Sequence, residues 1–557
     1  MTMTSYPPRE TVSLNGIWSF RFLPETFLEE TEEATVACDS AAAVPGDFDV
    51  LPETFCRRGC GVYRRNFRLE RPFANALLNI GGIGLRGRFR IDGKEVGFTN
   101  LPWSGVAFET GPLAAGEHEI TAVIDNNFSP EKMKLFHPYY DFYAFGGFHR
   151  GIELISLPEG TAFDRVQVRT ADFRTGKVTL RALFRSGPVS ALQVRFDTER
   201  EFRTVENGAE LTVPDFRLWS PESPALHTVE VRAGNDSIVE TFGVRQIEIG
   251  DKTLLLNGKP IYLKGFNRHE SHAVAGAATT EQMMLEDLQN LKSLHCNFVR
   301  GSHYPQSRTF LDLCDRLGFL VWEESLGWGN TRTQLADPEF MALQEEQTRL
   351  MVRNSINHPS VIIWGFLNEF DSASQEGRNL CKRLMDAIHE EDSSRPATFA
   401  SCHTMADVCF DLVDLVAFNT YPGWIQENYD ADPMGAIGPE LEKLVRRIRS
   451  VVPADKPVMV SEMGTCALYG ERDRAACQWS EEFQAEYLDE TIRNVFASNE
   501  LCGLAIWQMN DAKSYLRQGA NIRCKPLALN LAGVFDAARR PKQSAAVVRN
   551  RFQEKTT

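Results

Sequence analysis

Eight short apolar runs, separated by segments of helical pattern, occupy the second half of this 557-residue chain. They are IYLKGF from residue 261, NFVRG from 297, FLVWEE from 319, VIIWGFLNE from 361, ATFAS from 397, LVAFN from 415, PVMVSE from 457 and GLAIWQM from 503. Eight strand and helix alternations of this length are typical of a (β/α)8 TIM barrel. We therefore expect a barrel over residues 250–557.

The segments between these runs carry helix start signals. Thr279 and Gln282 have the spacing of a capping box, and Asp337 precedes Pro338 as a helix cap precedes a first-turn proline. The sequence predicts that helices begin at these two places.

The first half of the chain predicts two β-sandwiches. Residues 1–158 alternate apolar and polar side chains in short runs broken by Gly, Pro and Asn, and Asp92-Gly93 signals a hairpin. Residues 159–249 continue the alternation over about the length of an immunoglobulin-like domain. The predicted architecture is two sandwiches followed by a barrel.

Composition limits the partners and the compartment. The formal net charge is −15, and the sequence has no basic stripe, so we expect no nucleic-acid partner. It has neither a signal peptide at its start nor a long apolar segment, which predicts a cytoplasmic protein without a membrane partner. The twelve cysteines include no CxxC pair, and Cys56 and Cys60 lack further zinc ligands. We therefore expect free thiols, no metal and no cofactor.

Two carboxylates end barrel runs. Glu369 follows the fourth run and Glu462 ends the seventh, and active sites of such barrels lie at the carboxyl ends of the strands. Two converging carboxylates are what cleavage of a glycosidic bond requires. Asn419, Tyr421 and Trp424 follow the sixth run, where a hydrogen bond to the nucleophilic carboxylate would help.

Simpler explanations exist for each residue. A single Glu after a strand is often a surface residue, although two at the fourth and seventh positions of eight favour a site. His303 after the second run can be a structural histidine, and Trp507 in the eighth run can be core packing or a platform for a sugar face. Composition leaves these alternatives open.

Motifs along nearly the whole chain resemble family 2 glycoside hydrolases. They are LNGIWSF, GVYRRNF, LWSPESPALHTVEV, LLLNGKPIYLKGFNRHE, FVRGSHYP, NHPSVIIWGFLNE, VSEMG and GVFDAARRPK. The resemblance implies a jelly-roll domain, an immunoglobulin-like domain and a barrel, often in a homo-oligomer, acting on a glycoside or oligosaccharide.

The same resemblance assigns residue roles. It implies that Glu369 is the acid/base, that Glu462 is the nucleophile, and that Tyr421 orients Glu462. Asn368 would bind the 2-hydroxyl of the sugar. His303 and Trp507 match positions that line the sugar pocket. The implied activity is that of a retaining β-glycosidase. The short segment from WEESLGWGNTRT to DPEF has no long insertion to cover the barrel mouth, and binding of one end of a sugar chain in a closed pocket predicts exo action.

One segment, YDFYAFGGFHRGIEL, looks most like the β-glucuronidase branch, whose similar loop places an Asp in the sugar site; here it is Asp141. In that branch an Asn-x-Lys motif holds the sugar carboxylate, but this chain has Asn530 followed by Ala532. A missing cation would cost a charge-assisted bond worth about 1.5 to 3 kcal/mol.

We therefore expect a neutral pyranoside such as a β-galactoside. The alternative is a β-hexuronidase in which another basic residue holds the carboxylate, and four are candidates: Arg332, Arg517, Arg523 and Lys525. Two further alternatives are a non-catalytic carbohydrate-binding protein and a transglycosylase that uses the same residues.

Overall fold

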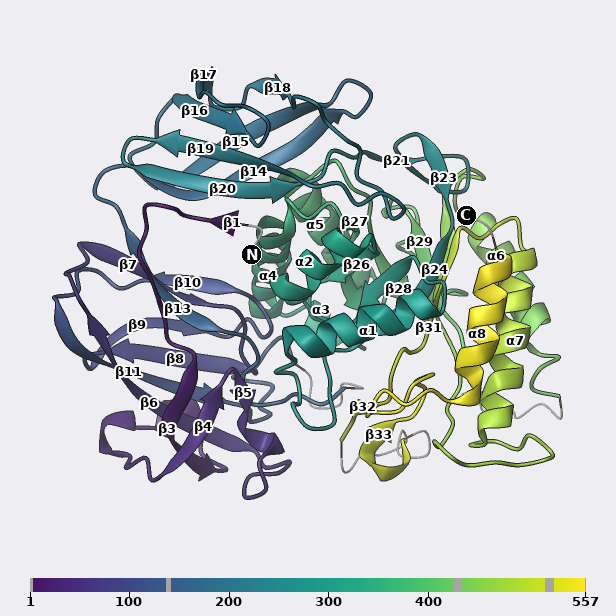
Figure 1. Ribbon diagram of the computed structural model, residues 1–557. Coiled ribbons are helices and arrows are strands. Elements are labelled where there is room, and N and C mark those ends of the chain that lie inside the picture. Colours follow the sequence, from purple (N-terminus) through teal and green to yellow (C-terminus); the bar gives the residue numbers. More distant parts are fainter. Residues whose placement is uncertain (1–3, 137–141, 425–431, 516–524, 556–557) are drawn as a thin grey trace.

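The computed structural model describes residues 4–136, 142–424, 432–515 and 525–555. It has two β-sandwiches and a closed barrel surrounded by helices (Figure 1). In the view of Figure 1 the two sandwiches lie beside the barrel, the second above the first. The predicted combination of two sandwiches and a TIM barrel is confirmed.

The first sandwich contains two main sheets with strand orders β10-β7-β13-β2 and β4-β3-β6-β11-β8-β9, and β12 pairs with β5. Its strands are β2 (Thr11–Ser13), β3 (Gly16–Pro24), β4 (Ser40–Val44), β5 (Gly46–Asp47), β6 (Gly59–Leu69), β7 (Asn75–Ile80), β8 (Arg86–Ile91), β9 (Lys94–Thr99), β10 (Val106–Glu109), β11 (Gly116–Asp125), β12 (Gly147–Phe148) and β13 (Ile152–Leu157). Three short 3₁₀ turns interrupt them: η1 (Leu28–Glu30), η2 (Glu33–Thr35) and η3 (Phe48–Val50).

The predicted hairpin at Asp92-Gly93 is present. It joins β8 to β9, and both turn residues have positive φ, 51° and 76°. A turn with two residues of positive φ matches the twist of the strands that it joins. Between the sheets, the alternating apolar side chains pack around Trp18, Tyr63 and Phe148.

The second sandwich pairs a sheet of order β1-β20-β19-β16-β17 with a sheet of order β14-β15-β18. Its strands are β1 (Thr4–Ser5), β14 (Ala162–Asp172), β15 (Lys177–Ser186), β16 (Ala191–Phe196), β17 (Arg203–Glu206), β18 (Glu210–Thr212), β19 (His227–Ala233) and β20 (Asp236–Phe242). Residues 4–5 therefore extend a sheet of the second sandwich, although the predicted boundary places them in the first. Thr4 pairs with Glu240 in β20 and donates its hydroxyl to the Glu240 carboxylate at 2.6 Å.

The eight predicted runs form the eight parallel strands of the closed barrel. These are β24 (Leu263–Arg268), β25 (Phe298–Gly301), β26 (Leu320–Glu324), β27 (Val361–Asn368), β28 (Ala397–Ser401), β29 (Val416–Asn419), β30 (Val458–Met463) and β31 (Gly503–Ile506). The helices are α1 (Glu281–Ser293), α2 (Arg308–Leu317), α3 (Arg332–Leu335), α4 (Pro338–Ser355), α5 (Gln375–Glu391), α6 (Ile437–Arg449), α7 (Glu481–Ala497) and α8 (Gln543–Glu554). None of these described helices is long and apolar enough to cross a membrane.

Two helix starts test the cap predictions. Asp337 caps α4 and Pro338 occupies its first turn, as predicted. The predicted capping box at Thr279 is wrong by one residue, because α1 is capped by Thr280, whose hydroxyl accepts a hydrogen bond from the Met283 amide. Adjacent threonines offer the same cap chemistry, so the sequence alone does not choose between them.

The connection between β28 and β29 departs from the expected alternation, because described residues 402–415 form turns instead of a helix. The Asp407 carboxylate organises these turns. It accepts hydrogen bonds from the Ser401 hydroxyl at 2.6 Å, the Ser372 hydroxyl at 2.5 Å and the Cys409 amide at 2.7 Å. These bonds fix the loop to the ends of two barrel strands.

Three small antiparallel strands close the amino-terminal end of the barrel, and a two-stranded antiparallel sheet lies beyond its eighth strand. The first group is β21 (Ile247–Ile249), β22 (Leu254–Leu256) and β23 (Lys259–Ile261), whose apolar side chains join the core at the strand starts. The second sheet pairs β32 (Ala512–Lys513) with β33 (Leu529–Asn530), which follows the 3₁₀ turn η5 (Pro526–Ala528).

The first sandwich is anchored to the barrel loops by buried polar contacts. Arg150 pairs with Glu270, after β24, at 2.8 Å. Asp47 accepts a hydrogen bond from the Ala277 amide at 2.6 Å and pairs with His149 at 2.8 Å. Because these loops follow the first barrel strand, the sandwich fixes one wall of the barrel mouth.

Candidate active site

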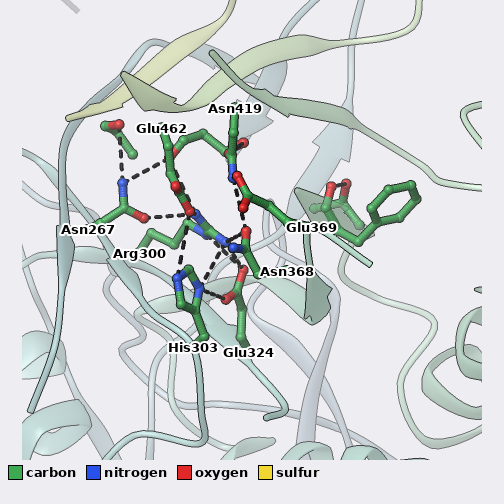
Figure 2. A network of polar contacts seen from close by, with 12 residues as sticks. Asn267, Arg300, His303, Glu324, Asn368, Glu369, Asn419 and Glu462 are labelled. Carbon is green, nitrogen blue, oxygen red and sulfur yellow. Dashed lines mark hydrogen bonds and ion pairs between the residues drawn. The ribbon is translucent and has the colours of Figure 1, made fainter. Parts of the chain in front are cut away.

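Two glutamates meet at the carboxyl-terminal mouth of the barrel. Glu369 directly follows β27, and Glu462 lies near the end of β30. Both carboxylates point into one buried polar network (Figure 2). Asn419 lies between them, because its Nδ2 donates to Glu369 Oε1 at 2.8 Å and its backbone pairs with Glu462. The structure therefore brings the two predicted carboxylates together.

Glu462 is held by a donor on each carboxylate oxygen. Arg300 Nη1 donates to Oε1 at 2.7 Å, and the Tyr421 hydroxyl donates to Oε2 at 2.7 Å. Hydrogen bonds from a cation and from a phenol both favour the ionised form of a carboxyl group. This environment suits a carboxylate that must act as a nucleophile.

Glu369 lies in a different environment. Burial, together with the negative charge of Glu462, raises the pKa of Glu369 to about 7. Its backbone has a left-handed φ of 54°, and its amide donates to the Ala400 carbonyl at 2.9 Å. A glutamate rarely adopts this backbone conformation, which costs about 1 to 3 kcal/mol, so the surrounding structure must stabilise it. A carboxyl group with a pKa near 7 can both donate and accept a proton at neutral pH.

Arg300, from β25, connects the network. It is fully buried and donates to four side chains: Glu324 at 2.7 Å, Glu462 at 2.7 Å, Asn267 at 2.9 Å and Asn368 at 2.9 Å. Burial alone would lower the pKa of Arg300, but the two carboxylates raise it. The guanidinium is therefore a fixed positive charge between two buried negative groups.

His303 stays neutral beside this cation. Burial and the charge of Arg300 lower the pKa of His303 to about 3. Its Nδ1 lies 3.0 Å from the acceptor Glu324 Oε2 and 3.3 Å from the donor Arg300 Nη2, and we assign the imidazole proton to Nδ1 because the carboxylate is nearer. Nε2 then remains as an acceptor; it lies 3.7 Å from Glu462 Oε1 and makes no hydrogen bond among the described residues. The Trp507 ring stacks on His303 with ring centroids 5.3 Å apart.

Asn368 and Asn419 complete the floor of the site. Asn368 Oδ1 accepts hydrogen bonds from Arg300 and from Asn419 Nδ2 at 3.1 Å. The fixed oxygen directs Asn368 Nδ2 elsewhere, and within the described parts of the chain this buried donor has no partner. Since buried polar groups are normally satisfied, Asn368 Nδ2 and His303 Nε2 are positions where a ligand hydroxyl group would bind.

Three further predicted site residues, Trp424, Asn530 and Arg332, each have protein contacts of their own. Trp424 is buried and packs edge-on against Trp479, so its described contacts are with protein. Asn530 is buried in β33, and its Oδ1 accepts a hydrogen bond from the Ala532 amide at 3.2 Å. Arg332 lies outside the network, because its exposed guanidinium pairs with Glu376 at 2.8 Å.

Three predicted positions fall outside the described residues: Asp141, Arg517 and Arg523. Lys525, at the edge of the described chain, is half-buried just before η5, and burial lowers its pKa to about 7.

Sequence reasoning missed Arg300, Glu324 and Asn267. Each ends or nearly ends a barrel strand, as Glu369 and Glu462 do. A polar residue at the carboxyl end of an apolar run was the available signal, and Arg300 lies within the FVRGSHYP motif. Their role became visible only through their mutual contacts.

One group of three described side chains has metal-ligand chemistry: Asp312, Asp315 and His358. His358 Nδ1 lies 2.5 Å from Asp315 Oδ2, and the two nearby carboxylates raise the pKa of His358 although burial opposes them. The two carboxylates therefore favour the protonated form of the His358 imidazole.

The comparisons with known proteins agree with this geometry. The model of the TIM barrel domain of glycosyl hydrolases family 2 matches residues 247–556, and a second model, described as glycosyl hydrolases family 2, matches residues 162–245. The β-glucuronidase of Sus scrofa is 28% identical over 608 residues, covering 98% of this chain and 90% of that protein. The β-glucuronidase of Streptococcus agalactiae serotype V is 26% identical over 591 residues, covering 98% of this chain and 96% of that protein.

Among solved structures, a GH2 β-galacturonidase from Eisenbergiella tayi bound to galacturonate superposes with a TM-score of 0.87. It is 29% identical in sequence, and the match covers 99% of both chains. The similarity thus includes both sandwiches as well as the barrel.

Proposed function

Because the chain belongs to glycosyl hydrolases family 2 and is a β-glycosidase, we propose that it is a retaining exo-β-hexuronidase, which removes a terminal β-linked uronic acid. The observation that carries the proposal is the full-length similarity to β-glucuronidases and to a β-galacturonidase bound to galacturonate. It favours the hexuronidase alternative over the neutral pyranoside that Ala532 led us to expect.

The proposed reaction is a double displacement. Glu462 attacks the anomeric carbon while Glu369 gives its proton to the departing oxygen, which yields a covalent glycosyl-enzyme. Esterification removes the charge of Glu462, one of the two causes of the raised pKa of Glu369. The pKa of Glu369 then falls, so its carboxyl group is ionised and can act as a base. It takes a proton from a water molecule, which attacks the anomeric carbon and releases the sugar with overall retention of the anomeric configuration.

Two buried polar atoms without a hydrogen bond in the described structure support binding of a sugar in this place. Asn368 Nδ2 is a buried donor and His303 Nε2 a buried acceptor within the described structure. Together they can satisfy two hydroxyl groups of a pyranose, and the neighbouring Trp507 offers an apolar face.

Lys525 is our candidate for the carboxylate of the sugar. It lies just before η5 and β33, the elements that lead to Asn530 and Ala532. Since Ala532 provides no charge, another cation in this segment must form the ion pair. The burial that lowers the pKa of Lys525 to about 7 would also strengthen its attraction to an anion. Binding of a carboxylate would stabilise the protonated amine.

Within the hexuronides, β-galacturonides are our preferred substrates. Ala532 departs from the Asn-x-Lys motif of the glucuronidase branch that the sequence resembles, and the similar E. tayi structure contains galacturonate. A panel of p-nitrophenyl β-galacturonide, β-glucuronide, β-galactoside, β-glucoside, β-mannoside and α-L-arabinopyranoside tests the assignment. We expect the two uronides to be the best substrates. Preference for the galactoside would refute the uronidase proposal.

Replacement of Lys525 by Met tests the proposed carboxylate contact. We expect kcat/KM for the uronide to fall by about tenfold or more, because a charge-assisted bond is worth about 1.5 to 3 kcal/mol. The residual rate on the corresponding neutral sugar should not fall. In the unmodified enzyme, KM for the uronide should rise as the pH increases through about 7, where Lys525 loses its proton.

Lys513 provides the matched control, since this half-buried lysine of β32 lies with its Nζ 5.0 Å above the Phe55 ring. Replacement of Lys513 by Met should leave the uronide preference unchanged. An equal loss on uronide and neutral sugar in the Lys525 variant would assign that lysine a purely structural role.

A further inference from the structure

The backbone that carries Glu369 is irregular. Pairing of β27 with β28 shifts register between Gly365 and Asn368. Leu367 and Glu369 both have a left-handed φ, 44° and 54°. Irregular strand ends beside active sites redirect a side chain, and residues other than glycine adopt a left-handed backbone only where the surrounding structure holds them there. The direction of the Glu369 carboxyl group therefore depends on contacts made by its neighbours.

One buried carboxylate, that of Asp407, connects the two segments that hold Glu369. Its Oδ2 accepts hydrogen bonds from the hydroxyl groups of Ser372 at 2.5 Å and Ser401 at 2.6 Å. Ser372 lies three residues after Glu369. Ser401 follows Ala400, whose carbonyl accepts a hydrogen bond from the Glu369 amide at 2.9 Å. Asp407 thus joins the segment that leaves Glu369 to the strand end that binds its backbone.

This connection is buried and is reinforced from the same loop. Asp407 Oδ1 accepts a hydrogen bond from the Cys409 amide at 2.7 Å, and the Val408 amide donates to the Ser372 carbonyl at 3.1 Å. Asp407 is 4% exposed, and both serines are fully buried. Because water does not reach the serine hydroxyl groups, loss of Asp407 would leave them without their shared acceptor and would loosen the two segments.

Asp407 does not contact the reacting groups. Its hydrogen bonds within the described chain go to the two serines and to the Cys409 amide. The Glu369 carboxylate is contacted separately, by Asn419 Nδ2 at 2.8 Å. An effect of Asp407 on catalysis must therefore pass through the backbone of Glu369.

The proposed nucleophile is held by other parts of the barrel. Glu462 accepts hydrogen bonds from Arg300 on β25 and from Tyr421 after β29. Asp407 instead joins the segments that follow β27 and end β28. Loss of Asp407 should therefore disturb the acid/base group and leave the attacking carboxylate in place.

We propose that Asp407 is a positioning residue for Glu369. By binding Ser372 and Ser401 together, it fixes the backbone from which the acid/base carboxyl group reaches the oxygen of the leaving group. The inference rests on the proposed function, in which Glu369 protonates that oxygen. A general acid acts only when its proton lies within hydrogen-bond reach of the departing atom, so a small shift of the backbone lowers the rate.

Replacement of Asp407 by Ala tests the proposal through the leaving group. We compare kcat/KM for the 2,4-dinitrophenyl and methyl β-glycosides of the sugar that the substrate panel identifies. The methyl glycoside needs a proton on its leaving oxygen, so its kcat/KM should fall by about 10- to 100-fold, because misplacement by about 1 Å can cost this much. The 2,4-dinitrophenyl glycoside needs no such proton and should change little. The readout is the ratio of the dinitrophenyl value to the methyl value, which should rise and which a loss of folded enzyme leaves unchanged.

Two milder variants keep the test usable if the Asp407→Ala protein folds poorly. Replacement of Ser372 by Ala removes one of the two serine bonds, so it should raise the ratio by less than the loss of Asp407 does. Replacement of Asp407 by Asn keeps an oxygen acceptor for both serines and should return the ratio most of the way to that of the unmodified enzyme. An Asn variant with a ratio as high as that of the Ala variant would contradict positioning through these bonds.

Ser394 provides the matched control for Ser372. Its hydroxyl donates to the buried Asp392 at 2.6 Å, but this pair lies between α5 and the start of β28, at the opposite end of the barrel. Replacement of Ser394 by Ala removes an equivalent bond and should leave the ratio unchanged.

Replacement of Glu369 by Gln separates failure of this inference from failure of the proposed function. If the Glu369 variant raises the ratio and the Asp407 and Ser372 variants do not, Asp407 is not a positioning residue, and the acid/base assignment stands. If none of the three variants raises the ratio, the assignment of Glu369 is wrong, and the inference about Asp407 fails with it.

Discussion

Replacement of Glu462 by Gly is expected to lower kcat for aryl glycosides by about 10⁵-fold, because loss of a nucleophile removes the covalent pathway as a whole. In the structure Glu462 receives hydrogen bonds from Arg300 and Tyr421, both at 2.7 Å, which hold one carboxylate orientation. No other described carboxylate shares this pair of donors. Steady-state rates and thermal unfolding of the purified variant would measure activity and folding independently.

Azide distinguishes a lost nucleophile from a damaged site. In the Glu462 variant, the cavity left by the side chain admits the small anion, which attacks the anomeric carbon directly and yields an α-glycosyl azide by inversion. Replacement of Glu323 by Gln is the control, since this buried glutamate of β26 binds the Gln306 amide at 3.1 Å, away from the Arg300 network. A folded Glu462 variant with near-normal turnover would refute the assigned role.

The barrel could be predicted from sequence because its strands are short, apolar and regularly spaced. Burial on both faces gives a continuous apolar run, and the run ends where the strand reaches the mouth. Glu369 and Glu462 were identified for the same reason, since each interrupts such a run at its carboxyl end. In this fold a polar residue at the carboxyl end of a strand therefore also lies where active sites are built.

The contacts that join these residues were not predictable from sequence. Arg300 binds Glu324, Asn267, Asn368 and Glu462, which are distributed over 196 residues from 267 to 462. Their proximity depends on closure of the barrel, which no local pattern encodes. An arginine in an apolar run is equally consistent with a strand end at the surface, so only the structure shows that Arg300 is buried.

The structure departs from the sequence-based expectation in two places, for similar reasons. The first strand, Thr4–Ser5, is too short to show an alternation, and its sheet is determined by the distant β20. Between β28 and β29, side-chain bonds to Asp407 replace the expected helix with turns. In both cases tertiary contacts override a weak local preference.

Replacement of Glu369 by Gln should affect substrates according to their leaving groups. For alkyl glycosides, which need protonation of the departing oxygen, we expect kcat/KM to fall by about 10² to 10⁴-fold. For 2,4-dinitrophenyl glycosides, whose leaving group is stable without a proton, the first step should change little. Burst kinetics would reveal accumulation of the glycosyl-enzyme, because the variant also lacks the base for hydrolysis.

The pH dependence provides the second half of this test. Burial and the charge of Glu462 raise the pKa of Glu369 to about 7, so the carboxyl group is protonated below that pH and ionised above it. Since the acid must be protonated, kcat/KM of the unmodified enzyme for alkyl glycosides should fall as the pH rises through about 7. Lys525 titrates over the same range and would add its own decline on uronides, so the comparison is made in enzyme that already carries Met at position 525. Glutamine has no proton to lose, so adding the Glu369 replacement to that enzyme should abolish the remaining alkaline decline. A decline of the same midpoint in the doubly substituted enzyme would mean that another group is the acid.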